Sequence, residues 1–145
     1  IDRLYEASQA GVRIDLIVRG ICCLIPGRKY SRNIRVTRIV DTFLEHARVW
    51  YFGNGGKPKL FLGSPDWMRR NLYRRIEAVT PILDPDLKRE LSDMLSIQLS
   101  DKRKACFVDD HLRNRWKSAR PQKEKVRAQY TFYEYLKSGE LRVES

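Results

Sequence analysis

The chain contains no apolar run that approaches the roughly 20 residues a helix needs to cross a bilayer. It also shows no pattern of a secretory signal peptide. The first residues, from Ile1, already follow a helical pattern and do not begin with Met, so we expect a fragment of a longer protein. Together these features predict a cytoplasmic protein, with peripheral association with a membrane as an alternative.

Cysteine is also scarce, with three in 145 residues. Cys22 and Cys23 are adjacent, which is poor geometry for a disulfide and the wrong spacing for a metal site. We expect these two and Cys106 to be reduced and to pack as small hydrophobic side chains. No metal site is predicted within this chain.

A nucleotide-binding P-loop is missing, although glycines cluster at 53–56. A P-loop needs Gly, four further residues, and then Gly-Lys followed by Ser or Thr. Here Pro58 follows Gly56-Lys57, and Tyr51 stands where the first glycine belongs. The glycines are better explained as the turn of a hairpin, because Asn and Gly tolerate positive φ.

Positive charge is abundant. Lys plus Arg number 29 against 18 Asp plus Glu, which gives a net charge of +11. Such an excess favours an anionic partner, whether nucleic acid, a nucleotide, another polyphosphate or an acidic membrane surface, although it can also serve solubility alone. Apolar residues make up 42% of the chain, which is enough for one folded domain over 1–145.

The patterns of apolar residues predict a mixed α/β fold. Val12–Val18 is densely apolar and β-branched, which is typical of a buried strand. Asp66 is expected to cap a short helix that points backbone N–H groups at an anion. The other expected elements are a first helix ending at Gly11, a helix over 34–44, strands over 47–52, 59–62, 75–79 and 105–108, a helix opened by Asp84-Pro85, and a last helix from Val126 to Gly139.

Two basic positions lie where such folds bind ligands. Arg19 follows the carboxyl end of the first strand, the edge at which open α/β sheets bind ligands. An arginine there can direct a planar fork of donors at a phosphate, or it can be an ordinary surface residue. The loop over 26–33 is basic and is either a flap over an anion or a solvated connection.

His46 is the most informative titratable residue. An imidazole can attack phosphorus, donate a proton to a departing phosphate oxygen, or bind that oxygen as a cation. Nearby arginines would neutralise the charge of a phosphoryl transition state. The neighbours of His46 in the sequence are Arg48, Gly63-Ser64, Asn71, Arg75 and Glu77. The second histidine, His111, has no such company, and we expect it on the surface.

The pattern of His46-x-Arg48, Gly63-Ser64-x-Asp66, Asn71 and Arg75-x-Glu77 resembles a half-motif of the phospholipase D superfamily. In that superfamily a His-x-Lys motif precedes a Gly-Ser-x-Asn stretch. Arg48 in place of Lys and Asp66 in place of Asn depart from the general pattern. The resemblance implies a phospholipase-D-like mixed sheet flanked by helices.

A more specific resemblance accounts for these departures. Segments 16–22, 43–48, 66–71 and 127–129 look like the C-terminal domain, the second phospholipase-D-like one, of bacterial polyphosphate kinases of the polyphosphate-synthesising type. That family reversibly transfers the terminal phosphate of ATP to polyphosphate with Mg²⁺. The resemblance implies that the phosphorylated histidine and the residues associated with Mg²⁺ lie in the preceding domain, outside this chain.

The resemblance also assigns roles to residues. His46 would contact the nucleotide phosphates and act as a general acid, and Arg19 and Arg75 would contact ATP phosphates. Ser64 and Asn71 complete the expected ATP and phosphate site. The expected partners are ATP or ADP, polyphosphate, the preceding domains of the same chain and a second copy in a homo-oligomer, with no nucleic acid.

Two rival functions stay open from the sequence. One is a phosphodiesterase of phospholipase D type, in which two copies of His46 meet in a dimer. The other is a non-catalytic module that binds polyanions with a steep salt dependence. For a polyphosphate kinase, this chain holds half of a site, so we expect the isolated chain to bind polyphosphate or ATP weakly and to be inactive.

Overall fold

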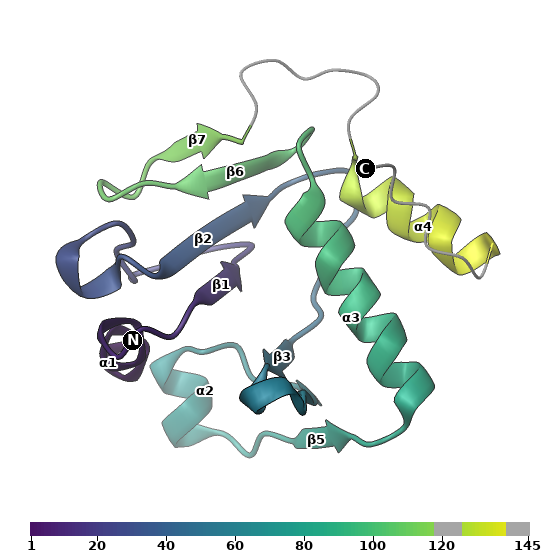
Figure 1. The fold of residues 1–145 in the computed structure, drawn as a ribbon, viewed down its shortest axis with the longest axis horizontal. Coiled ribbons are helices and arrows are strands. Elements are labelled where there is room, and N and C mark those ends of the chain that lie inside the picture. Colours follow the sequence, from purple (N-terminus) through teal and green to yellow (C-terminus); the bar gives the residue numbers. More distant parts are fainter. Residues whose placement is uncertain (118–125, 139–145) are drawn as a thin grey trace. The chain divides into compact units, whose positions relative to one another are not determined.

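The computed structural model describes residues 1–117 and 126–138 (Figure 1). The chain divides into two compact units. Unit 1 combines Ile1–Phe43 with Ser96–Ser145, and unit 2 is the segment Leu44–Leu95 between them. Unit 2 is therefore an insertion in the sequence of unit 1.

Unit 1 is built on a mixed four-stranded sheet with the order β1-β2-β6-β7 (Figure 1). β1 and β2 are parallel, and the β2–β6 and β6–β7 pairs are antiparallel. The strands are β1 (Ile14–Ile17), β2 (Ile34–Ile39), β6 (Ala105–Val108) and β7 (Asn114–Trp116). This mixed sheet with flanking helices confirms the predicted fold class.

Unit 1 also contains α1 (Asp2–Gln9), the 3₁₀ turn η1 (Lys29–Ser31) and α4 (Ala128–Ser138), and α3 (Pro85–Ser100) begins in unit 2 and ends in unit 1. The predicted start of α3 is confirmed, because the Asp84 carboxylate accepts hydrogen bonds from the backbone N–H groups of Asp86 and Leu87 at 2.9 and 3.0 Å. Gly11, at φ +92°, follows α1 as predicted. The predicted end of α4 at Gly139 lies outside the described residues.

Unit 2 contains a three-stranded antiparallel sheet with the order β3-β4-β5. Its elements are β3 (Val49–Phe52), η2 (Asn54–Gly56), β4 (Lys59–Gly63), α2 (Arg69–Arg74) and β5 (Val79–Ile82). The predicted hairpin is confirmed. Asn54, Gly55 and Gly56 all have positive φ, which only Gly and Asn adopt at low cost.

The helix predicted over 34–44 is wrong, because residues 34–39 form β2 at the centre of the sheet. Ile34, Val36 and Ile39 are buried there. Their spacing is compatible with a helix, but the segment is rich in β-branched residues. These residues fit a pleated strand that has neighbours on both sides better than they fit a helix.

Two predictions in unit 2 also need correction. α2 begins at Arg69, and Met68 rather than Asp66 occupies the N-cap, with no side-chain cap hydrogen bond. The strand predicted over 75–79 begins only at Val79. Asp66 thus lies two residues before the N-cap, and its side chain forms an ion pair with Arg48.

The core of unit 1 has two apolar clusters. Leu24, Ile34, Val36 and Val108 form one, and Ile39, Ile97, Ala105 and Ala128 form the other, which joins β2, α3, β6 and α4. All three cysteines are free thiols, and burial raises the pKa of Cys106. No helix in the described part of the chain is long and apolar enough to span a membrane.

Candidate functional site

His46 lies in unit 2 in an irregular segment, because residues 40–48 form neither helix nor strand. β3 starts directly after this segment and fixes its far end. The imidazole is half exposed, so it is accessible to a ligand. The histidine therefore depends on its neighbours, rather than on regular structure, for its orientation.

Arg48 is the main contact of His46. Its Nη2 lies 2.6 Å from His46 Nε2, and its Nη1 donates to the His46 carbonyl oxygen at 3.2 Å. A guanidinium has no acceptor, so Arg48 must be the donor and Nε2 the acceptor. In this arrangement the neutral ring carries its proton on Nδ1. Within the described residues Nδ1 makes no hydrogen bond, and it is the ring's available donor.

Asp66 completes this cluster. Its Oδ1 accepts a hydrogen bond from Arg48 Nε at 3.2 Å and lies 3.7 Å from His46 Nε2. When the ring is protonated, Nε2–H becomes a donor. It can then turn to the Asp66 carboxylate rather than to Arg48. The cluster thus offers a partner for each protonation state of the histidine.

The two positions that depart from the phospholipase D pattern therefore contact one another. Arg48 is where that pattern has Lys, Asp66 is where it has Asn, and their side chains form an ion pair. The sequence showed both substitutions but did not indicate that they compensate each other.

Asn71 lies on α2 and is 4% exposed. Its Nδ2 donates to the Asp66 carbonyl oxygen at 3.2 Å, so it holds the turn that carries the carboxylate. Its Oδ1 is buried and has no hydrogen-bond partner among the described residues. Asn71 is thus linked to His46 through Asp66, and it helps to hold the Asp66 carboxylate in place.

Ser64 forms hydrogen bonds with the segment that precedes β5. Its hydroxyl donates to the Glu77 carboxylate and accepts from the backbone N–H of Ala78 at 3.1 Å. Its own N–H donates to the Ala78 carbonyl oxygen at 3.0 Å. In this structure Ser64 fastens residues 77–78 beside the end of β4.

Gly63 and two tryptophans pack next to these residues. A Cβ at Gly63 would lie 2.7 Å from Trp50 Cζ3 and 2.9 Å from the Ala78 carbonyl oxygen, so a larger residue does not fit. Trp50 in turn stacks on Trp67, with ring centroids 6.3 Å apart. The sequence analysis did not predict this packing.

The two predicted phosphate arginines are exposed. Arg75 follows α2, and within the described residues it forms no hydrogen bond or ion pair. Arg19 follows β1 in unit 1, at the predicted carboxyl end of the strand. The structure thus joins His46, Arg48, Asp66 and Asn71 by direct contacts, and among the described residues Arg75 forms none with them.

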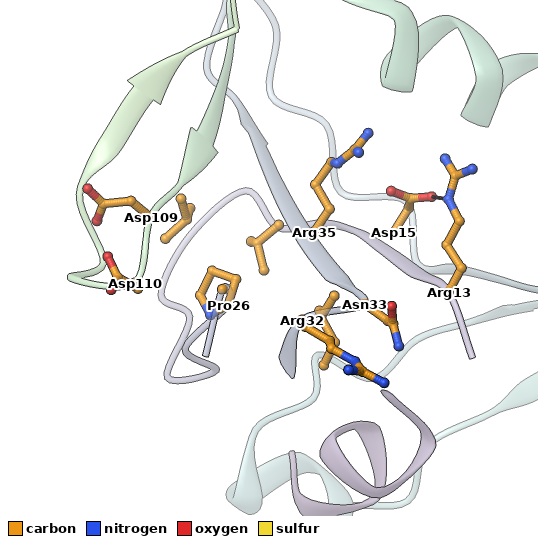
Figure 2. Close-up of a pocket in the computed structure, with 12 residues that line it drawn as sticks. Arg13, Asp15, Pro26, Arg32, Asn33, Arg35, Asp109 and Asp110 are labelled. Atoms are coloured by element: carbon orange, nitrogen blue, oxygen red, sulfur yellow. Dashed lines mark hydrogen bonds and ion pairs between the residues drawn. The ribbon is translucent and has the colours of Figure 1, made fainter. Parts of the chain in front are cut away.

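A pocket of about 450 Å³ lies at the other edge of the unit 1 sheet, where β1 and β2 begin and β6 ends (Figure 2). Its carboxylates already have arginine partners: Asp15 pairs with Arg13, Asp110 with Arg28, and Asp109 with Arg113 and Arg115. Figure 2 shows the guanidinium groups of Arg32 and Arg35 pointing in different directions, so they define no common anion centre. The loop over 26–33 contributes Pro26, Gly27, Arg32 and Asn33 to this pocket, whereas none of the residues predicted to contact ATP or phosphate lines it.

Backbone contacts dominate the electrostatics of Asp109, which lies at the rim of this pocket. The N–H of Arg113, then the N–H of His111 and the side chains of Arg115 and Arg113, hold the pKa of Asp109 well below its usual range. Asp109 is therefore a fully ionised structural acceptor for the turn between β6 and β7. His111 lies exposed on that turn, as its sequence context suggested.

Comparison with known proteins gives the family. A model of the polyphosphate kinase C-terminal domain 2 matches residues 1–129. The chain belongs to the polyphosphate kinase family. It is 50% identical to the polyphosphate kinase of Escherichia coli K12 over 141 residues, which is 97% of this chain and 20% of that protein. It is 58% identical to that of Synechocystis over 106 residues, which is 72% of this chain and 15% of that protein.

The solved structures agree with this membership. The crystal structure of polyphosphate kinase from Porphyromonas gingivalis matches 95% of this chain with a TM-score of 0.90 and 58% identity, over 21% of that protein. The resemblance seen in the sequence is thereby confirmed. This chain spans about a fifth of the length of these polyphosphate kinases.

The family also uses Mg²⁺, according to the resemblance. Among the residues that the structure describes, no group of three His, Cys, Asp or Glu side chains is arranged to hold a metal ion. The residues present do not fit such a site, so no step proposed below passes through a metal on this chain.

Proposed function

We propose that this domain forms the nucleotide side of the phosphotransfer site of a polyphosphate kinase. In the reaction, the bond between the terminal phosphorus of ATP and its bridging oxygen breaks. A new bond forms to a histidine in the preceding domain, and ADP leaves with the bridging oxygen. The phosphate then passes to the end of a polyphosphate chain. His46 donates a proton to the departing oxygen of ADP.

The observation that carries this proposal is the cluster of His46, Arg48 and Asp66. A general acid must hold a proton until charge develops on the leaving oxygen and must then release it. In the protonated ring both nitrogens carry a hydrogen, and the Asp66 carboxylate lies 3.7 Å from Nε2. When Nε2 gives its proton to the leaving oxygen, Nδ1 keeps its hydrogen and Nε2 becomes an acceptor, to which the Arg48 Nη2, at 2.6 Å, can donate. The cluster is thus suited to both states of one proton transfer.

The remaining predicted residues supply positive charge and hydrogen bonds to the phosphates. Arg19 and Arg75 are exposed, and their guanidinium forks match phosphate oxygens in a bidentate geometry. Asn71 acts mainly by holding Asp66. Ser64 would reach a phosphate only if its bond to Glu77 were exchanged, so its backbone-fastening role comes first.

Four further expectations accompany this proposal. The whole enzyme uses Mg²⁺ held mainly by residues outside this chain, assembles as a homo-oligomer through its other domains, is located in the cytoplasm, and acts on ATP and polyphosphate. A peripheral position on the inner membrane is the alternative location. Each is a property of the longer protein, of which this chain covers about a fifth.

The test is to replace His46 in the full-length enzyme with Ala and with Gln, and to measure polyphosphate synthesis from ATP. We expect kcat to fall by about 10²–10⁴ for both variants, the usual range for loss of a general acid, with circular dichroism unchanged. His111→Ala is the matched control, because it removes the other, exposed histidine. Unchanged turnover in the His46 variants would remove this residue from the mechanism.

The same assays distinguish the rival functions. Cleavage of a phosphodiester by the 145-residue chain, lost on changing His46, would indicate a phospholipase-D-type enzyme. Polyanion binding that is insensitive to His46, together with unchanged synthesis in the full-length variant, would indicate a binding module. Steady polyphosphate synthesis from ATP by the isolated chain would contradict the expectation that this chain holds only half of the active site.

A further inference from the structure

The residues at the start of α4 hold residues 41–43, which end the first segment of unit 1. Arg127, immediately before α4, donates from Nε and Nη2 to the two carboxylate oxygens of Asp41 at 2.8 and 2.7 Å. Its Nη2 also donates to Thr42 Oγ1 at 3.0 Å. The Asp41 side chain is only 2% exposed, so this bidentate pair is shielded from solvent.

Gln129 holds the next residue through its backbone. Its Oε1 accepts from the N–H of Phe43 at 2.7 Å, and its Nε2 donates to the Phe43 carbonyl oxygen at 2.6 Å. Gln129 is 7% exposed. The side-chain amide pairs with Phe43 as a neighbouring strand would, and it needs both a donor and an acceptor to do so.

Tyr130 closes the same turn from the next position. The Arg127 guanidinium lies over the Tyr130 ring at 4.1 Å, and the Tyr130 hydroxyl is 3.4 Å from Thr42 Oγ1. The Tyr130 and Phe43 rings are 6.0 Å apart. Every residue from 41 to 43 thus has a side-chain contact from the turn at 127–130. We call Arg127, Gln129 and Tyr130 of this turn the α4 clamp.

The α4 clamp is itself anchored to the sheet by Asp101, which is fully buried. Asp101 Oδ2 accepts from the N–H of Ala128 at 2.7 Å, and its Oδ1 accepts from the N–H of Ala105 at 2.9 Å. Ala105 opens β6 and pairs with Ile39 of β2. The clamp therefore holds residues 41–43 at a fixed place relative to the strand that they leave.

This arrangement has a consequence for His46, which lies three residues after Phe43 in a segment without regular structure. Such a segment is positioned mainly by what holds its two ends. β3 holds one end, and the α4 clamp holds the other.

We propose that Arg127 and Gln129 are positioning residues for His46: by fixing residues 41–43 they set where the imidazole stands in the phosphotransfer site. They act through the backbone and touch no reacting group. This inference rests on the proposed role of His46 as the general acid. It assigns a function to the 127–129 segment, which the sequence comparison had matched to the family without a role.

The test uses the full-length enzyme and a double-mutant cycle between Gln129→Glu and His46→Ala. Glu keeps the shape of Gln129 but replaces its donor with an oxygen that faces the Phe43 carbonyl. We expect kcat to fall by about 10- to 100-fold, the scale of an ångström-sized misplacement, with KM for ATP changed by less than about threefold. In the His46→Ala background the same change should have no further effect on kcat.

Two controls separate positioning from stability. Gln9→Glu makes the same chemical change on an exposed residue of α1 and should leave kcat unchanged. Val36→Ala removes buried volume from the core without touching the α4 clamp, and should lower the melting temperature but not kcat. If the Gln129 variant fails to fold, Arg127→Lys tests the positioning role instead, because lysine keeps the positive charge but cannot form the bidentate pair with Asp41.

Each result of the cycle is decisive. A kcat loss that disappears in the His46→Ala background supports the proposal. Normal kcat in Gln129→Glu or in Arg127→Lys, or losses that multiply with that of His46→Ala, would overturn the positioning role and leave the proposed function standing. If His46→Ala alone has no effect, the proposed function fails, and the positioning role fails with it.

Discussion

Arg48 and Asp66 form an ion pair over 3.2 Å between the segment that precedes β3 and the segment that precedes α2. Arg48 also contacts the histidine, so one guanidinium connects the carboxylate to the imidazole. The orientation of the ring therefore depends on a charge pair that is partly shielded, with 24% of the Arg48 side chain exposed.

This pair predicts strong non-additivity in the full-length enzyme. Arg48→Gln and Asp66→Asn each break the same contact, so each should lower kcat by about 10²-fold, the lower end of the range for general acid–base catalysis. The double variant should lose no more than the more damaging single variant, because the interaction is already absent. Losses that multiply, measured as kcat for synthesis from ATP, would show that the two residues act independently.

Gly63 predicts a packing defect in unit 2. In Gly63→Ala the new Cβ meets the Trp50 ring and the Ala78 carbonyl oxygen below 3.0 Å, so the free energy of unfolding should fall by about 1–3 kcal/mol. Because Trp50 stacks on Trp67, the near-ultraviolet circular dichroism should change as well. Gly53→Ala is the control, since a Cβ there meets nothing within 4 Å and its φ is −63°. Equal stability of the two variants would contradict the packing seen here.

Asp101 predicts the largest loss of stability from a single polar change. Its carboxylate accepts hydrogen bonds from the N–H groups of Arg103, Lys104, Ala105 and Ala128. Asp101→Ala leaves buried N–H groups unpaired, each at a cost of about 1–3 kcal/mol, so the chain should lose several kcal/mol or fail to fold.

The control for that change is Asp86→Asn, which affects an exposed pair with Arg89 and should cost about 1 kcal/mol or less. Urea denaturation of the two variants and the parent chain gives the comparison. An Asp101→Ala chain as stable as the control would mean that these N–H groups find other partners.

Acid should weaken the α4 clamp. The hydrogen bond from Arg127 is the main cause that holds the pKa of Asp41 below its ordinary value of 3.8. A carboxyl whose pKa is lower in the folded state stabilises the fold fully above the unfolded pKa, and loses that contribution as the pH falls towards the folded pKa. The stability difference between the parent chain and Asp41→Asn should therefore be constant above about pH 5 and shrink below about pH 4.

The measurement is the free energy of unfolding in urea at several pH values. At neutral pH the difference should be about 1.5–3 kcal/mol, as for hydrogen bonds to charged groups. A difference that stays constant down to pH 2 would show that Asp41 does not titrate with the fold.

Local sequence signals predicted the elements whose ends are marked by capping residues, proline or glycine. Asp84 and Pro85 mark the start of α3, and the glycines at 53–56 mark the hairpin. β2 was mistaken for a helix because the spacing of its apolar residues fits both periods. Its identity as a strand depends on β1 and β6, and the latter lies more than sixty residues further along the chain.

In the candidate site, too, local features were predicted from the sequence and long-range contacts were not. His46 was predicted from its type and its neighbours, but the ion pair of Arg48 with Asp66 joins residues eighteen positions apart. The bonds of Gln129 to Phe43 span 86 positions. A glutamine or an aspartate looks like an ordinary surface residue in a sequence, and only the folded chain shows which backbone groups it reaches.

The insertion of unit 2 within unit 1 also constrains synthesis. β2 leaves the ribosome before unit 2, and its antiparallel partner β6 appears only after all of Leu44–Leu95 has been made. One edge of β2 therefore waits unpaired while the growing chain completes the β3–β4–β5 sheet. The α4 clamp comes later still, so the segment that leads to His46 is among the last parts of the domain to be secured.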